Sequence, residues 1–382
     1  MIHPDDIPKL EAKWASERSL EPFRMSGGSK HAKIALVGEA WGEREDLFKH
    51  PFVGYAGMEL ARMLHEAGLT GYFKSAPSGA PEPYMMSHWQ ASGLFLTNVF
   101  ADRPPNNKLK EWCLPKAGVP KDYSLPYLKS GEYIHPAFIP HLDRLYAELK
   151  AVRPHLIIAL GNTACWALLG QTSISKIRGT TSWSKAVDCK VLPTYHPSAV
   201  LQNWSLRTIV LQDLLKAKRE GLQPEIKRPE RWVLINPTLD DIYHWALRPA
   251  QLYAVDIETK RGQITMVGFA RSPQDAIVIP FINPDNTNYW ATHEDEVRAW
   301  RMVKEMLERD TPKIFQNGLY DLSYLVKYSI RPRNCSEDTM LLSHSLWPEM
   351  RKGLDFLGSI WTSESSWKLM RTRNKDAEKR ED

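Results

Sequence analysis

Two series of alternating strand and helix patterns, separated by a basic stretch, constrain the fold of this chain most. The first series runs from residue 33 to residue 220 and the second begins at residue 232. Such alternation predicts parallel sheets with helices packed against them. The intervening stretch, residues 216–231, is basic and contains Pro224 and Pro229, which is typical of a linker. A chain of 382 residues is long enough for two domains with separate cores.

We therefore expect an α/β protein with two domains. Its segments are an irregular N-terminal arm (1–30), a first α/β domain (31–222), a linker (223–231), a second α/β domain (232–369) and a charged tail (370–382). In the second domain, strand patterns follow one another before the long helical pattern begins. This order predicts a mixed sheet that contains an antiparallel meander.

The composition narrows the class of protein. Hydrophobic residues make up 43% of the chain and charged residues 25%, which is ordinary for a globular protein. No apolar run approaches the roughly 18 residues of a membrane span, and the start does not resemble a signal peptide. The four cysteines form no close pairs, which argues against a disulfide framework or a zinc finger. We expect a cytoplasmic protein, in a bacterium or an infected host cell, with no membrane partner.

An acidic pair lies inside an apolar strand pattern, VDIET at residues 255–259. Side chains alternate between the faces of a strand, so Asp256 and Glu258 project on the same side. Two carboxylates on one face repel each other unless a cation lies between them. Mg²⁺ or Mn²⁺ prefers such oxygen ligands and keeps positions open for phosphate oxygens, which favours metal-assisted phosphodiester cleavage. The alternative is a strand end with two solvated acids.

Further tracts of the second half extend this pattern. They are NGLYD at 317–321, EDTMLL at 337–342 and KGLDFLG at 352–358. Together with the acidic pair, they resemble the 3′→5′ exonuclease domain of family A DNA polymerases. The resemblance implies a ribonuclease H-like fold in which Asp256, Glu258 and Asp321 bind two Mg²⁺ ions. Asn317, four residues before Asp321 at a helix start, would face the substrate.

Two residues of this resemblance leave alternatives open. Asp338 would either orient the metal site or cap the next helix. The family carries one more aspartate near its end, and the only candidate here is Asp376, for which a solvated tail acid is the favoured interpretation. Exonuclease activity is therefore a weaker expectation than the exonuclease fold.

The first half carries six tracts whose order is informative. They are VGEAWGERED at 37–46, PFVGYAGMEL at 51–60, LTNV at 96–99, RPPNN at 103–107, IALGNTA at 158–164 and YHPS at 195–198. Together they resemble the uracil-DNA glycosylase superfamily, nearest its iron–sulfur-containing branch. The resemblance implies a three-layer domain around a parallel sheet and a pocket for a base that has left the DNA stack.

The resemblance also implies a role for each site residue. Phe52 would stack on the base, Asn98 would read its edge, and His196 would donate a hydrogen bond to the departing base. Glu39 and Glu45 would position water or stabilise the sugar cation. Ser198 would help to hold the DNA backbone. The alternatives are that Phe52 belongs to the core and that Glu39 is a helix N-terminal acid favoured by the dipole.

The first half departs from the family at two places. Trp41 stands where the family typically has proline, so the base preference stays open. The cluster cysteines are missing, and Ala101-Asp102 stands where one of them would precede Arg103. An iron–sulfur cluster needs about four thiolates close together. We therefore expect none, and expect packing to hold the loop at 103–136.

The combined expectation is a DNA-processing enzyme. One domain would excise uracil, and the other would trim 3′ ends with Mg²⁺ or Mn²⁺, as a proofreading subunit for a separate DNA polymerase, in a phage-like replication system. DNA would be the substrate of both domains. The rival is a non-catalytic, DNA-binding replisome scaffold built from two degraded enzyme folds.

Overall fold

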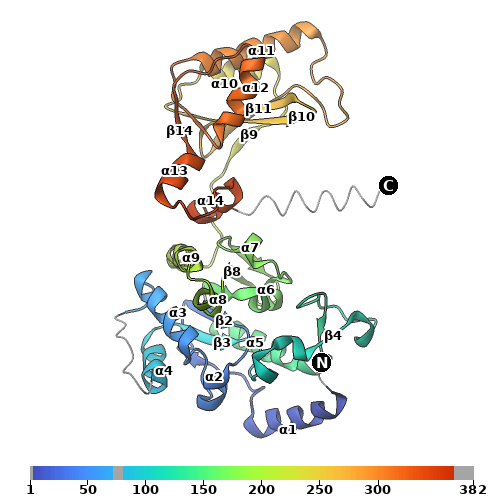
Figure 1. The fold of residues 1–382 in the computed structure, drawn as a ribbon, viewed down its shortest axis with the longest axis vertical. Helices are drawn as coiled ribbons and strands as arrows, with labels where there is room; N and C mark the ends of the chain where they lie inside the picture. Colours follow the sequence, from blue (N-terminus) through green and yellow to red (C-terminus); the bar gives the residue numbers. More distant parts are fainter. Residues whose placement is uncertain (1–2, 72–80, 365–382) are drawn as a thin grey trace. The chain divides into compact units, whose positions relative to one another are not determined.

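A computed structural model describes residues 3–71 and 81–364 of the chain (Figure 1). Contacts divide the chain into two compact units, Arg228–Leu357 and the remainder, Met1–Lys227 with Gly358–Asp382. The first division lies within the segment expected to be a linker. The second lies within helix α14 (Leu354–Trp361), earlier than the domain end expected from the sequence.

The first unit is built around a six-stranded sheet with the order β1-β3-β2-β6-β8-β7. Its four central strands are parallel, and the two edge strands are antiparallel to their neighbours. The strands are β1 (Gly27–Gly28), β2 (Ile34–Gly38), β3 (Phe95–Asn98), β6 (Leu156–Leu160), β7 (Ser182–Ser184) and β8 (Cys189–Thr194). All residues of the four central strands are buried, as a sheet covered on both faces requires.

Helices cover both faces of this sheet and make it the middle of three layers. Along β2, Ala35 and Val37 point into one core, whereas Ile34 and Leu36 point into the other. The first core is completed by α1 (Ile7–Glu17), α5 (Ile139–Val152) and α6 (Gly161–Leu169). The second is completed by α3 (Tyr55–Glu66), α4 (Pro81–Ala91), α8 (Pro197–Gln202) and α9 (Leu206–Glu220).

The N-terminal arm corrects one expectation, because it contains helix α1 rather than an irregular segment. Pro8 lies in the first turn, where it needs no hydrogen-bond partner, and Trp14 is buried against the first core. The expected loop at 103–136 is indeed poor in regular structure. It holds only short turns and a two-stranded ribbon, β4 (Cys113–Leu114) with β5 (Tyr133–Ile134).

The second unit has its own six-stranded mixed sheet, with the order β14-β13-β10-β11-β12-β9. Strands β10 (Tyr253–Lys260), β11 (Gln263–Ser272) and β12 (Asp275–Pro280) form the expected antiparallel meander. Strands β13 (Lys313–Phe315) and β14 (Cys335–Asp338) continue parallel to β10, and β9 (Trp232–Leu234) runs parallel to β12. This is a ribonuclease H-like arrangement, so the fold class predicted from the sequence is confirmed for both halves.

The helices of the second unit are α10 (Leu239–Leu247), α11 (His293–Glu308), α12 (Gly318–Lys327) and α13 (Thr339–Leu346). Helix α10 was not expected from the sequence. Its signal is a capping box, in which Thr238 and Asp241 each bind the other's backbone N–H. Within the described ranges, no helix is both long and apolar enough to cross a membrane.

A buried ion pair fixes the end of β3 in the first unit. The Arg144 guanidinium donates to the Asn98 carbonyl at 2.5 Å, to the Val99 carbonyl at 3.1 Å and to the Glu148 carboxylate at 2.9 Å. Glu148 also accepts from the Thr97 hydroxyl at 2.7 Å and from the backbone N–H of Phe23 at 2.9 Å. The side chains of Arg144 and Glu148 are fully buried. The pair therefore ties α5, the end of β3 and the N-terminal segment together.

We expect Arg144→Met to lower the free energy of unfolding by about 3–5 kcal/mol, because it leaves the Glu148 charge buried without its partner. Urea unfolding of the full chain measures this loss. Arg62→Met is the matched control, because its partly exposed pair with Glu59 should contribute about 0–1 kcal/mol. Equal losses for the two variants would contradict the assignment.

Candidate active sites

A pocket of about 410 Å³ opens where the parallel strands of the first unit end. Open α/β sheets commonly bind ligands at this edge. All six residues that the sequence assigned to this site line it: Glu39, Glu45, Phe52, Asn98, His196 and Ser198. They follow or end β2, β3 and β8 or lie on the segments that leave those strands, so the topology gathers side chains that are far apart in sequence.

Glycine at position 38 allows the amide and the aromatic ring to meet at the base of this pocket. A Cβ atom there would lie 2.1 Å from Asn98 Oδ1 and 2.9 Å from the Phe52 ring. Phe52 is 3% exposed and has a positive φ of 57°, a conformation that bulky residues rarely adopt. Trp89 donates from Nε1 to the Phe52 carbonyl at 2.9 Å and helps to hold that conformation. Phe52 thus serves as both core residue and pocket wall.

His196 is held in one tautomer by its neighbours. Its Nδ1 accepts from the backbone N–H of Ser198 at 3.2 Å and lies 2.7 Å from the Ser198 hydroxyl. Because a backbone N–H can only donate, Nδ1 is unprotonated and Nε2 carries the hydrogen of the neutral ring. Burial lowers the pKa of His196, and the Glu39 charge opposes this effect only in part. The site therefore presents a neutral N–H donor near pH 7.

The two acidic side chains of the pocket have different surroundings. Glu39 accepts a short hydrogen bond from the Thr163 hydroxyl at 2.5 Å. Glu45, in the first turn of α2 (Glu43–Phe48), accepts from the backbone N–H of Gly54 at 3.2 Å. Glu45 therefore braces the segment that carries Phe52, whereas Glu39 combines a position in the pocket with one fixed oxygen. Neither arrangement is that of a simple solvated surface acid.

Sequence reasoning did not assign several pocket residues a role. Thr163, Tyr195, Pro104, Asn107 and Lys129 also line the cavity. All of these except Lys129 lie inside tracts that carry the family resemblance, so membership of a tract was the available signal. Trp41 lines the pocket as well, is 2% exposed and packs with Met25 and Ala101.

The expected metal ligands of the second unit lie on β10 and α12. Residues 253–258 of β10 alternate between buried and exposed positions, so Asp256 and Glu258 share the exposed face. Asp321 is 4% exposed, and its Oδ1 accepts from the backbone N–H of Ile257 at 3.0 Å. Burial raises the pKa of Asp321 to about 6, with contributions from the charges of Asp256 and Asp338. Burial and the Glu258 charge also raise the pKa of Asp256. The site therefore concentrates negative charge.

Asn317 and Asp338 make backbone contacts at the starts of helices α12 and α13. Asn317 begins α12 with a positive φ of 61°, and its backbone N–H donates to Asp338 at 3.2 Å. Asp338 also accepts from the backbone N–H groups of Gly318, Met340 and Leu341, at 2.7, 2.8 and 3.3 Å. Of the two roles left open for Asp338, the capping contacts are thus present. Asp376 lies outside the described residues.

The part of the chain that the structure describes contains no preformed metal site. In that part of the chain, no three side chains of His, Cys, Asp or Glu form a group arranged to hold a metal ion. The expected set of Asp256, Glu258 and Asp321 is thus not assembled as a finished cage. Their oxygen donors do match the preference of Mg²⁺ and Mn²⁺.

Similarity to other proteins extends over both halves. A DNA polymerase of Bacillus phage SP01 is 23% identical over 301 residues, which cover 68% of this chain and 31% of the polymerase. Among solved structures, Escherichia coli RNase D, an exoribonuclease, matches with a TM-score of 0.27 and 15% identity over 36% of this chain and 34% of its own. The chain thus spans about a third of the length of these two proteins.

The first half has closer relatives. Type-4 uracil-DNA glycosylase of Thermotoga maritima is 32% identical over 196 residues, covering 50% of this chain and 79% of that protein. The enzyme of the same name from Saccharolobus solfataricus is 32% identical over 225 residues, covering 56% and 84%. Residues 25–218 match the family described as the uracil DNA glycosylase superfamily. The chain belongs to this superfamily.

Proposed function

We propose that the first unit hydrolyses the N-glycosidic bond of deoxyuridine in DNA. The observation that carries this proposal is the convergence of a neutral histidine N–H donor, a buried amide and an aromatic ring on one pocket of about 410 Å³. The names of the Type-4 relatives support the same activity.

The pocket offers a contact for each part of a uracil base that has left the stack. The ring of Phe52 provides an apolar surface against which the base packs. The Asn98 amide offers a donor and an acceptor, which matches the edge of uracil. Because Asn98 is held by Arg144 through its carbonyl, the amide is presented by a rigid strand end. Binding therefore orients the base before the bond breaks.

Hydrolysis develops negative charge on the departing base and positive charge on the sugar. The Nε2–H of His196 donates to a carbonyl oxygen of the base and stabilises that negative charge. Glu39, fixed by Thr163, stabilises the sugar cation and orients the water that adds to C1′. The bond from C1′ to the base nitrogen breaks, and the base leaves as an anion with the bonding electron pair. The proton that the water loses on adding to C1′ neutralises this anion. Ser198 orients His196 and contacts the DNA backbone.

In the second unit, we infer a 3′→5′ exonuclease that depends on a divalent metal. Asp256 and Glu258 share one face of β10, and the pKa of Asp256 and that of Asp321 are raised, which supports a carboxylate site that a cation would stabilise. Asp256, Glu258 and Asp321 would hold the ion, which supplies Lewis acidity at the phosphate when bound. The match to the phage polymerase supports this inference, because it covers more of the chain than the glycosylase region does.

These activities fit a role in repair and proofreading beside a separate DNA polymerase. A domain that removes uracil and a domain that trims 3′ ends would act on the same newly made DNA. The rival proposal is a scaffold that binds DNA without cleaving it. The two differ in one respect that is simple to measure, namely whether His196 is needed for uracil release.

We expect His196→Ala to lower kcat for uracil release by about 10²- to 10³-fold, because it removes the donor to the departing base. The assay uses a 5′-labelled single strand with one internal uracil, incubated in EDTA and cleaved with alkali. His31→Ala, which removes an exposed histidine outside the pocket, should leave kcat unchanged. Uracil release by His196→Ala at the wild-type rate would refute the assigned role.

A second prediction concerns the pH dependence of stability. The pKa of His196 is lowered in the folded chain, so the folded state binds fewer protons than the unfolded state. Stability is therefore lost as the pH falls below the unfolded value of about 6.5. Urea unfolding at pH 7.5 and pH 5.0 should show the wild type losing more stability than His196→Gln. Other histidines contribute equally to both proteins, so an identical loss would be the contrary result.

The metal site is tested by calorimetric titration of the full chain with Mn²⁺ at pH 7.5. Asp256→Asn should weaken binding by at least tenfold and abolish a Mg²⁺-dependent ladder from the 3′ end. Asp310→Asn, which changes an exposed aspartate elsewhere in the unit, should bind as the wild type does. Wild-type affinity in Asp256→Asn would exclude the proposed ligand set.

A further inference from the structure

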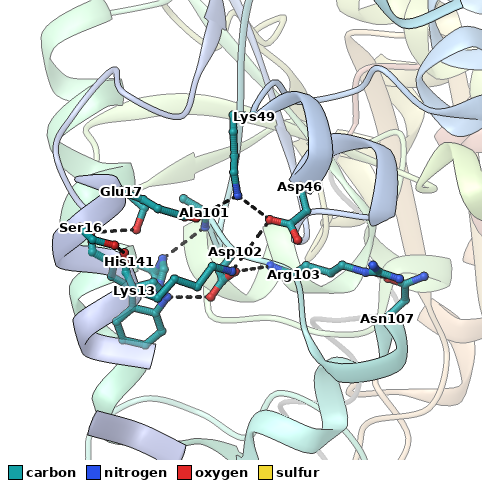
Figure 2. A network of polar contacts seen from close by, with 12 residues as sticks. Lys13, Ser16, Glu17, Asp46, Lys49, Ala101, Asp102, Arg103, Asn107 and His141 are labelled. Carbon is teal, nitrogen blue, oxygen red and sulfur yellow. Dashed lines mark hydrogen bonds and ion pairs between the residues drawn. The ribbon is translucent and has the colours of Figure 1, made fainter. Parts of the chain in front are cut away.

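Asp102 is a buried carboxylate in the turn that follows β3. It is 1% exposed and accepts from Lys13 Nζ at 2.5 Å, from Trp14 Nε1 at 2.7 Å and from the backbone N–H of Arg103 at 2.8 Å (Figure 2). Such contacts compensate for removing a carboxylate from water. Lys13 and Trp14 both belong to α1, so Asp102 joins this helix to the end of β3.

Helix α1 precedes residues 25–218, the part of the chain that matches the glycosylase superfamily. It also contacts α2 through charges: Lys49 lies 2.7 Å from Asp46 and 3.1 Å from Glu17, and Lys13 lies 3.9 Å from Asp46 (Figure 2). Because α2 also carries Glu45, this bridge reaches one wall of the pocket.

The turn at Asp102 also contacts residues that line the pocket. The Asp102 carbonyl accepts from the backbone N–H of Trp41 at 3.1 Å, and Trp41 lines the pocket. Arg103 Nε donates to Asn107 Oδ1 at 2.8 Å, and Asn107 is also a pocket residue. A displacement of Asp102 would thus move residues that enclose the base.

The cysteines do not fit the iron–sulfur cluster that the family resemblance implies. All four lie in the described part of the chain, but on separate elements and without grouping: Cys113 on β4, Cys165 on α6, Cys189 on β8 and Cys335 on β14. Cluster ligands are thiolates. Burial instead raises the pKa of Cys113 and that of Cys189 to about 11, which favours the thiol.

Aromatic side chains fill the region next to Asp102. The Trp14 ring centroid lies 4.6 Å from that of His141 and 5.2 Å from that of Phe138, in edge-to-face contacts. His141 is fully buried, and its Nδ1 accepts from the backbone N–H of Ala101 at 3.2 Å. The segment before Arg103 is thus fixed by a polar and aromatic network rather than by packing alone, which refines the expectation from the sequence.

We propose that the contacts of Asp102 with Lys13 and Trp14, named here the α1 anchor, position the pocket walls and replace an iron–sulfur cluster. Asp102 is a positioning residue that acts through Trp41 and Asn107. The proposal rests on the proposed glycosylase function in one respect only, namely that the pocket binds a uracil base. The anchor itself can be measured independently of activity.

The experiment compares the full-length wild type with Asp102→Asn, Lys13→Met and Lys13→Arg. Glu220→Gln is the matched control, because Glu220 pairs with the buried Lys190 at 3.0 Å near the start of β8, whereas the pocket lies beyond its end. Four quantities are measured: bound iron and zinc, Tm with and without chelator, amide hydrogen exchange at 39–48, and the Kd for a single strand carrying 2′-fluoro-2′-deoxyuridine. Kd is measured at least 15 °C below the Tm of each variant.

We expect no stoichiometric iron or zinc in the wild type and no effect of chelator on Tm. Asp102→Asn and Lys13→Met should lower Tm by roughly 6–20 °C, because each breaks a pair in which the carboxylate is buried and the lysine is 34% exposed. They should also accelerate exchange at 39–48 and raise Kd about tenfold. Lys13→Arg should retain wild-type Kd and exchange, and Glu220→Gln should change only Tm.

Two results would overturn the proposal. Stoichiometric metal whose removal lowers Tm would show that a metal centre holds this region. The second result is an Asp102→Asn variant whose Tm is lowered but whose amide exchange at 39–48 and Kd equal those of Glu220→Gln. Asp102 would then stabilise the fold without positioning the pocket. If the wild type does not bind the oligonucleotide, the glycosylase function fails, and amide exchange at 39–48 still decides whether the anchor exists.

Discussion

The buried pair of Arg144 and Glu148 is the interaction on which the pocket of the first unit depends. Arg144 holds the carbonyls at the end of β3, and Glu148 holds the backbone of the N-terminal segment at Phe23. Asn98 is the last residue of β3, so the position of its side-chain amide is set by the end of that strand. An amide that reads a base must be held before the base arrives, because a mobile group would lose part of its binding energy in becoming ordered.

The same edge of the sheet explains why sequence reasoning found this site. Strands β3, β2, β6 and β8 are parallel and adjacent in that order, so residues at their carboxyl ends lie along one edge of the sheet. The tracts that carry Glu39, Asn98 and His196 stand at the ends of β2, β3 and β8. The tautomer of His196 could not be predicted from the sequence, because it is set by the hydrogen bond from the backbone N–H of Ser198 to Nδ1. Helix α1 was also missed, because its stability comes from Trp14 packing on distant residues rather than from a strong local pattern.

In the second unit, the sequence predicted the meander and the shared face of Asp256 and Glu258, because both follow from period-two alternation. It left the role of Asp338 open. Four backbone N–H groups donate to Asp338, so this side chain connects the starts of α12 and α13 whatever else it does. The raised pKa of Asp321 likewise depends on burial that no local pattern reveals. The unit thus carries Asp256 and Glu258 on one face of β10, and the buried Asp321 carboxyl accepts a hydrogen bond from the same strand.

The central claim is that the strand-end pocket releases uracil through protein groups alone. Mass spectrometry of the free base, after incubation of wild-type protein with a single uracil-containing strand in EDTA, measures this directly. The account predicts one uracil released per strand, with no release of thymine or cytosine from strands that lack uracil. Binding of the strand without any release of uracil would contradict the claim and favour a scaffold that holds DNA without acting on it.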